Sequence, residues 1–147
     1  MSMLTSPRLQ RAVDNLVVKS FAVTSDDSVL ITGDYNTEME LLDAVAASVA
    51  RAGGKPLIAL APVLPYQGGM SDPYVSTSLK AAANDSDIWF DFCFPYHAGS
   101  GMHSSTMENG RCRYCLLAMS SAESFERLYG CVDYNTLLEF NVAIAEY

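Results

Sequence analysis

Residues 28–60 read SVLITGDYNTEMELLDAVAASVARAGGKPLIAL, and this stretch decides the fold. The apolar, β-branched run at 28–32 predicts a strand, and Thr37 opens a helix after a polar turn. The buried stripe of this helix is predicted to consist of Met39, Leu42, Val45, Ala46 and Val49. Gly53-Gly54 ends the helix, and residues 55–60 form the next strand. We therefore predict a β–α–β unit with two parallel strands.

The same alternation continues on both sides of this unit. Helices are predicted at residues 7–20, from 71–73 to 83, at 122–129 and at 134–147, and further strands at 87–94 and 111–119. We therefore predict an α/β fold with a parallel, flavodoxin-like (Rossmann-like) sheet of about four strands and helices on both faces. The strand order 2-1-3-4 is favoured over 3-2-1-4. The aromatic run of the third strand is predicted to be core: Trp89, Phe90, Phe92 and Phe94.

The 147 residues are predicted to form a single domain, 1–147. Half of the residues are hydrophobic and 18% are charged, so we expect another chain or domain to cover part of the surface. The last predicted helix ends at Ala145-Glu146-Tyr147 without a glycine, a proline or a basic last turn. We therefore expect the N-terminal domain of a longer two-domain protein, or a homodimer.

Charge excludes several classes of partner. The net charge is −8 and the chain has nine Lys and Arg residues, which argues against binding to nucleic acid or to acidic membrane surfaces. No segment is long and apolar enough to span a bilayer, and the first ten residues lack the layout of a signal peptide. We expect a cytoplasmic protein whose partner is a small-molecule substrate.

Both histidines, His97 and His103, follow the third predicted strand in a segment punctuated by Gly99 and Gly101. Ligands of parallel α/β sheets lie beyond the carboxyl ends of the strands, so this loop is a candidate site. Three interpretations stay open: two solvated histidines, a metal site, or His97 as a general base or substrate contact. A metal site needs a third ligand, which Glu108 or Asp91 could supply only if the loop folds back.

Four cysteines are predicted to be reduced thiols, and Cys112 and Cys115 have CxxC spacing. In a strand, residues three apart point to opposite faces, so we interpret this pair as buried structural thiols. The turn at 33–36 is not a GxGxxG motif and has no P-loop lysine, so no Rossmann-type cofactor is expected. Asp34 and Asn36 are interpreted as turn and cap residues.

Residues 29–133 resemble the N-terminal domain of the aminopeptidase T-like metalloenzymes, a group that includes the 2,5-dihydroxypyridine 5,6-dioxygenases. The resemblance rests on the unit at residues 29–60, on KAAANDSDIWFDFCFPYH (80–97) and on GRCRYCLLAMSSAESFERL (110–128). In the dioxygenase branch a D-x3-D-x5-H pattern closes the third strand, and Asp87, Asp91 and His97 match it without a gap. The resemblance implies that His97 is a catalytic acid/base facing an aromatic substrate. Tyr96 and His103 are the candidate substrate-binding residues.

The resemblance also implies that the Fe or Zn ligands lie in a C-terminal domain that this chain lacks. We therefore expect no cofactor and no metal ligand in this chain. It would be inactive alone, as the substrate-pocket domain of a dioxygenase-type or aminopeptidase-type enzyme. His97→Ala is expected to lower activity and to have little effect on stability, because the loop is expected to be flexible. The alternative is a stand-alone, non-catalytic binding or dimerisation module.

Overall fold

The computed structural model describes residues 6–146 and contains a parallel sheet of four strands. The strands are β1 (Ser28–Asp34), β2 (Lys55–Ala61), β3 (Ile88–Asp91) and β4 (Arg113–Leu116). They lie in the order β2-β1-β3-β4, which confirms the predicted α/β fold and strand order. β1 is an inner strand, and Val29 pairs with Pro56 of β2 on one side and with Ile88 of β3 on the other. The carboxyl ends of all four strands therefore meet at one edge of the sheet.

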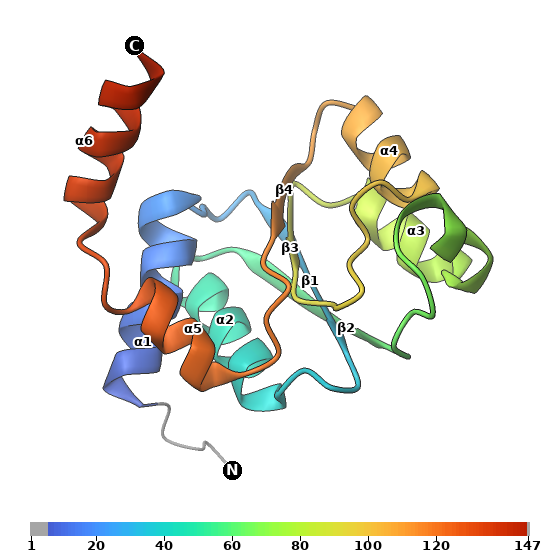
Figure 1. Cartoon of the computed structure of the whole chain (residues 1–147), viewed down its shortest axis with the longest axis horizontal. Helices are drawn as coiled ribbons and strands as arrows, with labels where there is room; N and C mark the ends of the chain where they lie inside the picture. The colour runs from blue at the N-terminus through green and yellow to red at the C-terminus, as the bar shows by residue number, and fades with distance from the viewer. Residues whose placement is uncertain (1–5, 147) are drawn as a thin grey trace.

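Helices cover both faces of the sheet. They are α1 (Pro7–Asp14), η1 (Asn15–Ser20), α2 (Met39–Arg51), η2 (Gly68–Tyr74), α3 (Thr77–Asn84), α4 (Gly101–Glu108), α5 (Ala122–Tyr129) and α6 (Tyr134–Ala145). In Figure 1, α1, α2 and α5 lie on one side of the sheet and α3 and α4 on the other, while α6 extends away from this body. No helix of residues 6–146 combines the length and the apolar character that crossing a membrane requires.

Two hydrophobic cores follow from the alternation of side chains along the strands. Ile31 and Phe90 pack with α1, α2 and α5, whereas Leu30 and Trp89 pack with α3 and α4. All four side chains are fully buried. Such inner strands are apolar on both faces because helices cover both faces, which is why they read as continuous hydrophobic runs in the sequence.

Cys112 and Cys115 of the CxxC motif are half-buried, and their side chains lie on opposite faces of the sheet, as predicted. Cys112 packs against the core under α3 and α4, and Cys115 packs against the core under α1, α2 and α5. All four cysteines lie within residues 6–146, and each is a free thiol there. Cys93 is buried and Cys131 is exposed, so burial differs among the four thiols.

The segment after β3 differs from the prediction in two ways. β3 ends at Asp91 rather than at Phe94, so Phe94 lies beyond the sheet and is 59% exposed instead of buried. The segment predicted as a loop contains α4, whose N-cap Ser100 accepts a hydrogen bond from the backbone N–H of His103. The sequence of α4, GMHSSTME, has no helical apolar stripe, so periodicity did not reveal it.

Other boundaries shift less. The helix predicted from 71–73 to 83 is two elements, η2 and α3, because Ser76 caps a new helix through the N–H of Leu79. The helix predicted at 7–20 is continuous, but its second half, η1, has π-helical hydrogen bonding. The last helix begins at Tyr134 as predicted, after the N-cap Asp133, and ends at Ala145. Its predicted last residue, Tyr147, lies outside the described residues.

Candidate active site

Asp91, the last residue of β3, is a fully buried carboxylate at the carboxyl edge of the sheet. The chain turns back around it immediately after the strand. The backbone N–H of Cys93 donates to Asp91 Oδ1 at 3.2 Å, and the backbone N–H of His97 donates to Oδ2 at 3.0 Å. These two bonds fold residues 92–97 over the carboxylate, and they bring the His97 ring to it.

Side chains from the two neighbouring strands complete the shell around Asp91. Thr32 of β1 donates its hydroxyl to Oδ1 at 2.9 Å, and Tyr114 of β4 donates its hydroxyl to Oδ2 at 2.7 Å. Trp89 of β3 in turn donates its indole N–H to the Thr32 hydroxyl at 2.9 Å. Because the Thr32 oxygen accepts the hydrogen bond from Trp89, its own hydroxyl proton is directed at Asp91. Three strands therefore fix the position of one carboxylate.

Hydrogen bonding sets the charge of Asp91. Burial by itself raises the pKa of this carboxyl, but the hydrogen bonds and charge of His97 and the Tyr114 hydroxyl outweigh it, so the pKa is lowered. The carboxylate in turn disfavours a second negative charge nearby. Burial first, and then Asp91, raise the pKa of the Tyr114 hydroxyl and of the Cys93 thiol. Tyr114 and Cys93 therefore keep their protons beside an ionised Asp91.

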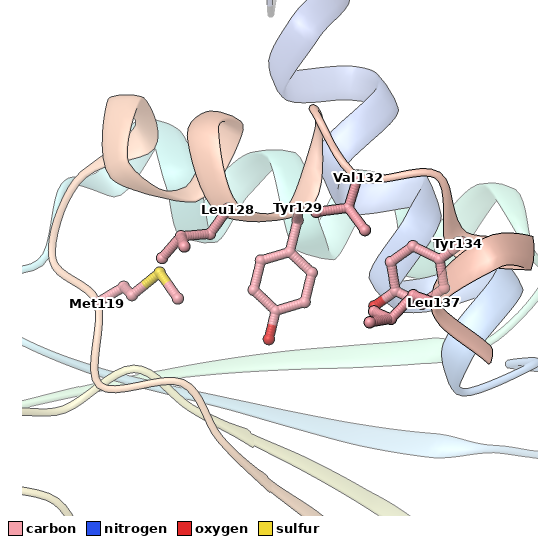
Figure 2. A pocket seen from close by; sticks show the side chains of 6 residues that line it. All are labelled: Met119, Leu128, Tyr129, Val132, Tyr134 and Leu137. Carbon is pink, nitrogen blue, oxygen red and sulfur yellow. The ribbon is translucent and has the colours of Figure 1, made fainter. Parts of the chain in front are cut away.

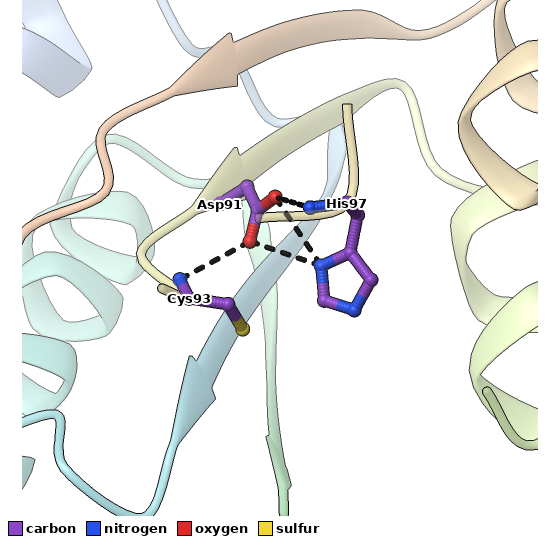
Figure 3. A group of neighbouring side chains, drawn as sticks. All are labelled: Asp91, Cys93 and His97. Atoms are coloured by element: carbon purple, nitrogen blue, oxygen red, sulfur yellow. Dashed lines mark hydrogen bonds and ion pairs between the residues drawn. The ribbon is translucent and has the colours of Figure 1, made fainter. Parts of the chain in front are cut away.

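His97 is 1% exposed and takes its orientation from Asp91 (Figure 3). Its Nδ1 lies 3.1 Å from Asp91 Oδ1 and 3.2 Å from Oδ2. An ionised carboxylate can only accept, so Nδ1 carries a proton and donates it. When the ring is neutral, its lone pair is therefore on Nε2, which points away from Asp91 in Figure 3. Among the described residues, Nε2 is buried without a hydrogen-bond partner.

The His97 ring forms part of the wall of a cavity of about 140 Å³. The rest of the wall comes from the carboxyl end of β2 and from the segment that leads through η2 to α3. It includes Leu60, Ala61, Leu64, Tyr74, Ser76 and Leu79. This is the edge of a parallel α/β sheet at which ligands bind. The cavity thus combines a mostly apolar wall with the polar residues Tyr74, Ser76 and His97.

The other two predicted site residues lie outside this cavity wall. Tyr96 is half-buried, and its ring centroid lies 6.5 Å from that of Phe94. His103 lies on α4, where its ring packs edge-on against Tyr114 with centroids 4.6 Å apart. Neither residue lines the cavity with His97, although the rings of His97 and His103 both pack against Trp89, with centroids 5.5 Å and 6.5 Å from its ring. The interpretation of His97 as a solvated loop residue is wrong, because the residue is buried against Asp91.

Tyr114 and Thr32 are site residues that sequence reasoning missed. Tyr114 follows Asp91 by 23 positions and reaches it only because β3 and β4 pair in register. Asp34, by contrast, fits its predicted role in a turn. It is buried, and its carboxylate accepts 2.8 Å hydrogen bonds from the N–H groups of Asn36 and Phe94.

Asp91, Cys93 and His97 each place one ligand atom within 4.8 Å of the others, which raises the question of a metal ion. The donor set does not fit one. Both Asp91 oxygens accept hydrogen bonds already, Nδ1 of His97 is protonated, and the raised pKa of Cys93 disfavours the thiolate that a metal binds. Only Nε2 is available, and zinc or iron needs further ligands. The absence of a metal from this chain remains a prediction.

Comparison with known proteins supports the fold. No protein-family model matches the sequence, and no curated protein matches it. Among solved structures, the chain is similar to the 2,5-dihydroxypyridine dioxygenase of Pseudomonas putida KT2440, with a TM-score of 0.61 and 13% sequence identity. The match covers 82% of this chain and 36% of the dioxygenase chain, so it spans about a third of that protein. At this identity the likeness establishes a distant structural relationship.

Proposed function

We propose that this chain is the substrate-pocket domain of a dioxygenase-type metalloenzyme, in which His97 exchanges a proton with the substrate. The observation that carries the proposal is the buried Nε2 of His97, which has no partner among the described residues, in a residue that lines a cavity. The structural similarity to a dioxygenase supports the reaction class. The iron or zinc ion of such an enzyme would be held by residues outside this chain.

The Asp91–His97 pair is suited to moving one proton. In its neutral form, His97 accepts a proton from a substrate hydroxyl at Nε2, and the resulting imidazolium keeps its Nδ1–H bond to Asp91. The buried carboxylate stabilises this positive charge, and the proton can later return to an intermediate or a product. A positioned acid/base of this kind contributes about 10²–10⁴-fold to a rate.

The cavity favours a single aromatic ring that carries a hydroxyl group. Its volume, about 140 Å³, is close to that of a cavity of about 150 Å³ that accepts benzene. Its apolar side chains would contact the faces of a ring, and Nε2 would accept one hydrogen bond. Among the described residues of its wall there is no carboxylate to bind the amino terminus of a peptide. This favours the dioxygenase type over the aminopeptidase type.

Ligand titration of the 147-residue chain tests the pocket directly. 3-Hydroxypyridine and phenol should shift the His97 ring resonances in an NMR titration, and toluene should shift them less. His97→Gln should weaken binding of phenol but not of toluene. His103→Gln is the matched control and should bind both like the wild type. Equal effects of the two variants, or resonance shifts that map away from the cavity, would refute the proposal.

The second candidate is a non-catalytic binding or dimerisation module, which the exposed apolar side chains of α6 favour. The two candidates differ in the full-length protein. If it is an enzyme of the proposed type, His97→Gln should reduce turnover by about 10²–10⁴-fold while His103→Gln has little effect. A protein with no turnover of hydroxylated aromatic compounds, whose association depends on α6, would support the second candidate.

A further inference from the structure

We propose that residues 62–74 form a flap that opens to admit a ligand to His97 and is held closed by a hydrogen bond between Asp72 and α4. The inference rests on the proposed function, since it concerns access to the same cavity. Solvent reaches the apolar groove between α5 and α6 (Figure 2), where Leu128 and Leu137 are exposed. His97, by contrast, is 1% exposed and its Nε2 is buried. A ligand can therefore hydrogen-bond to Nε2 only after part of the surrounding structure moves.

The flap is the part of the cavity wall that can move with the least disruption. Among the described residues, every lining residue other than His97 belongs to the stretch 60–79. Leu60 lies in β2 and Leu79 in α3, so both ends of this stretch are parts of regular elements. His97 itself is fixed to Asp91 through its backbone and its ring. The connection between β2 and α3 supplies the rest of the wall: Pro62, Leu64, Tyr74, Val75 and Ser76.

The flap is loosely packed against the domain. Leu64 is buried in the core under α3 and α4. The other large apolar side chains of the flap are exposed: Val63, Tyr66, Met70 and Tyr74. Segments with few buried apolar contacts open locally at a much lower free energy than the core strands of the same domain. Opening of the flap therefore leaves the sheet intact.

The tip of the flap is held at the N-terminus of α4. Asp72 Oδ1 accepts a hydrogen bond at 2.8 Å from the backbone N–H of Gly101, the first residue of α4. The helix dipole favours a negative charge at this end of the helix. Beside this bond, a β-carbon on Gly99 would lie 3.7 Å from the Cα of Gly68, so the two backbones are in contact. We call the bond between Asp72 and Gly101 the latch, and it joins the flap to the segment that follows His97.

The close approach at Gly101 provides a variant that opens the latch. A β-carbon on Gly101 would lie 2.9 Å from Asp72 Oδ2, so Gly101→Ala should displace the carboxylate and break the hydrogen bond. Gly69→Ala is the matched control, because a β-carbon on Gly69 would lie 3.9 Å from the same oxygen, in ordinary contact. Hydrogen exchange of the 147-residue chain measures the result. The flap amides should exchange at least about tenfold faster in Gly101→Ala and at the wild-type rate in Gly69→Ala, while the amides of β1 stay protected in both.

A covalent latch tests whether opening admits the ligand. A β-carbon on Gly101 would lie 3.3 Å from Cγ of Asp72, the atom that a cysteine sulfur would replace, which is close enough for a disulfide. In a Cys131→Ser background, the double variant Asp72→Cys/Gly101→Cys should form this bond on mild oxidation. Phenol should then leave the His97 ring resonances unshifted, and reduction should restore the shifts. Asp72→Cys alone is the control and should respond to phenol under both conditions.

The two measurements separate this inference from the proposed function. Equal phenol shifts in the oxidised and the reduced double variant would refute the flap and leave the cavity as a ligand site. Equal exchange of the flap amides in Gly101→Ala and Gly69→Ala would also overturn it. Faster exchange in Gly101→Ala alone would support the flap even if phenol failed to bind the wild type, a result that would refute only the proposed function.

Discussion

Replacing Asp91 by asparagine isolates the interaction on which the candidate site depends. The substitution keeps the size of the side chain, removes its charge and turns one acceptor atom into an NH2 donor. Either orientation of the amide creates a conflict. With nitrogen at the Oδ1 position it faces the backbone N–H of Cys93, and at the Oδ2 position it faces that of His97. A backbone N–H cannot reverse its polarity, so one buried donor loses its partner.

The size of the effect follows from these contacts. An unsatisfied buried donor costs about 1–3 kcal/mol, and losing the charge-assisted bond to His97 costs about 1.5–3 kcal/mol. Their sum agrees with the about 3–5 kcal/mol found when one partner of a buried pair is removed. For a domain of this size, we expect the Tm of Asp91→Asn to fall by about 10–20 °C. Thermal unfolding monitored by circular dichroism measures it.

Asp87→Asn is the control, since it makes the same change one position before β3. Asp87 accepts hydrogen bonds from the Ser28 N–H at 2.8 Å and from the half-exposed Arg111 at 2.7 Å. Unlike Asp91, the Asp87 carboxylate is in contact with solvent. Its substitution should therefore cost much less stability than that of Asp91. Equal losses from the two substitutions, or an unchanged Tm for Asp91→Asn, would refute the reasoning.

The pH dependence of unfolding gives an independent check on Asp91. Its pKa is lowered in the folded protein, so at acidic pH the unfolded state binds the proton more readily than the folded state. The stabilisation by the carboxylate is complete above the usual pKa of an aspartate and is lost as the pH falls through the folded pKa. The stability difference between the wild type and Asp91→Asn should therefore shrink in acid. A difference that stays constant would mean that folding does not shift the pKa of Asp91.

Three further predictions concern the network, the thiols and the metal content. Tyr114→Phe removes one hydrogen bond to Asp91 and should lower the free energy of unfolding by about 1–3 kcal/mol in urea titrations; no change would exclude that bond. Ellman's reagent should react fast with the exposed Cys131 and slowly with the buried Cys93, and the denatured, unreduced protein should show four free thiols; a count of two would reveal a disulfide. Elemental analysis of the tag-free chain should find no stoichiometric iron or zinc, and a full equivalent that disappears in His97→Gln would contradict the structure.

The burial of His97 changes the expected outcome of one obvious experiment. The sequence places His97 in a glycine-rich loop, for which an alanine substitution would be thermodynamically mild. In the structure the residue is 1% exposed and donates to a buried carboxylate. His97→Ala would leave Asp91 without this partner and open a void, so a stability loss is expected along with any loss of function. His97→Gln is the better functional variant because it retains much of the volume and can still donate.

The sheet was predictable because its inner strands are buried on both faces. Runs such as 29–31 are apolar at every position, and the turns between the strands contain glycines and caps. Strand ends were not predictable in this way. Apolar residues continue beyond Asp91 as far as Phe94, although the backbone leaves the sheet at Asp91. Hydrogen bonds from the N–H groups of Cys93 and His97 to the Asp91 side chain direct that turn, and hydropathy carries no information about them.

The candidate site therefore had to be assembled from contacts rather than from a pattern. The D-x3-D-x5-H spacing placed Asp91 and His97 six residues apart, but a hydrogen bond between their side chains requires the chain to reverse within those six residues. Tyr114 could be assigned only from the strand register, which pairs it with Trp89 and brings its hydroxyl beside the carboxylate. Side chains from three strands thus meet at one site, and no short stretch of the sequence contains all of them.

The uneven bonding of the His97 ring is the strongest reason to assign function rather than structure to this cluster. A buried carboxylate with a hydrogen-bonded partner is not required for stability, since apolar side chains of similar volume can often fill such a space as well or better. A purely structural histidine would be expected to have both ring nitrogens bonded, because an unpartnered buried polar atom costs free energy. Here Asp91 fixes Nδ1 with the help of Thr32 and Tyr114, while Nε2 has no partner among the described residues. A hydroxyl group of a bound molecule would satisfy Nε2, so the cost of leaving it bare would be recovered on binding.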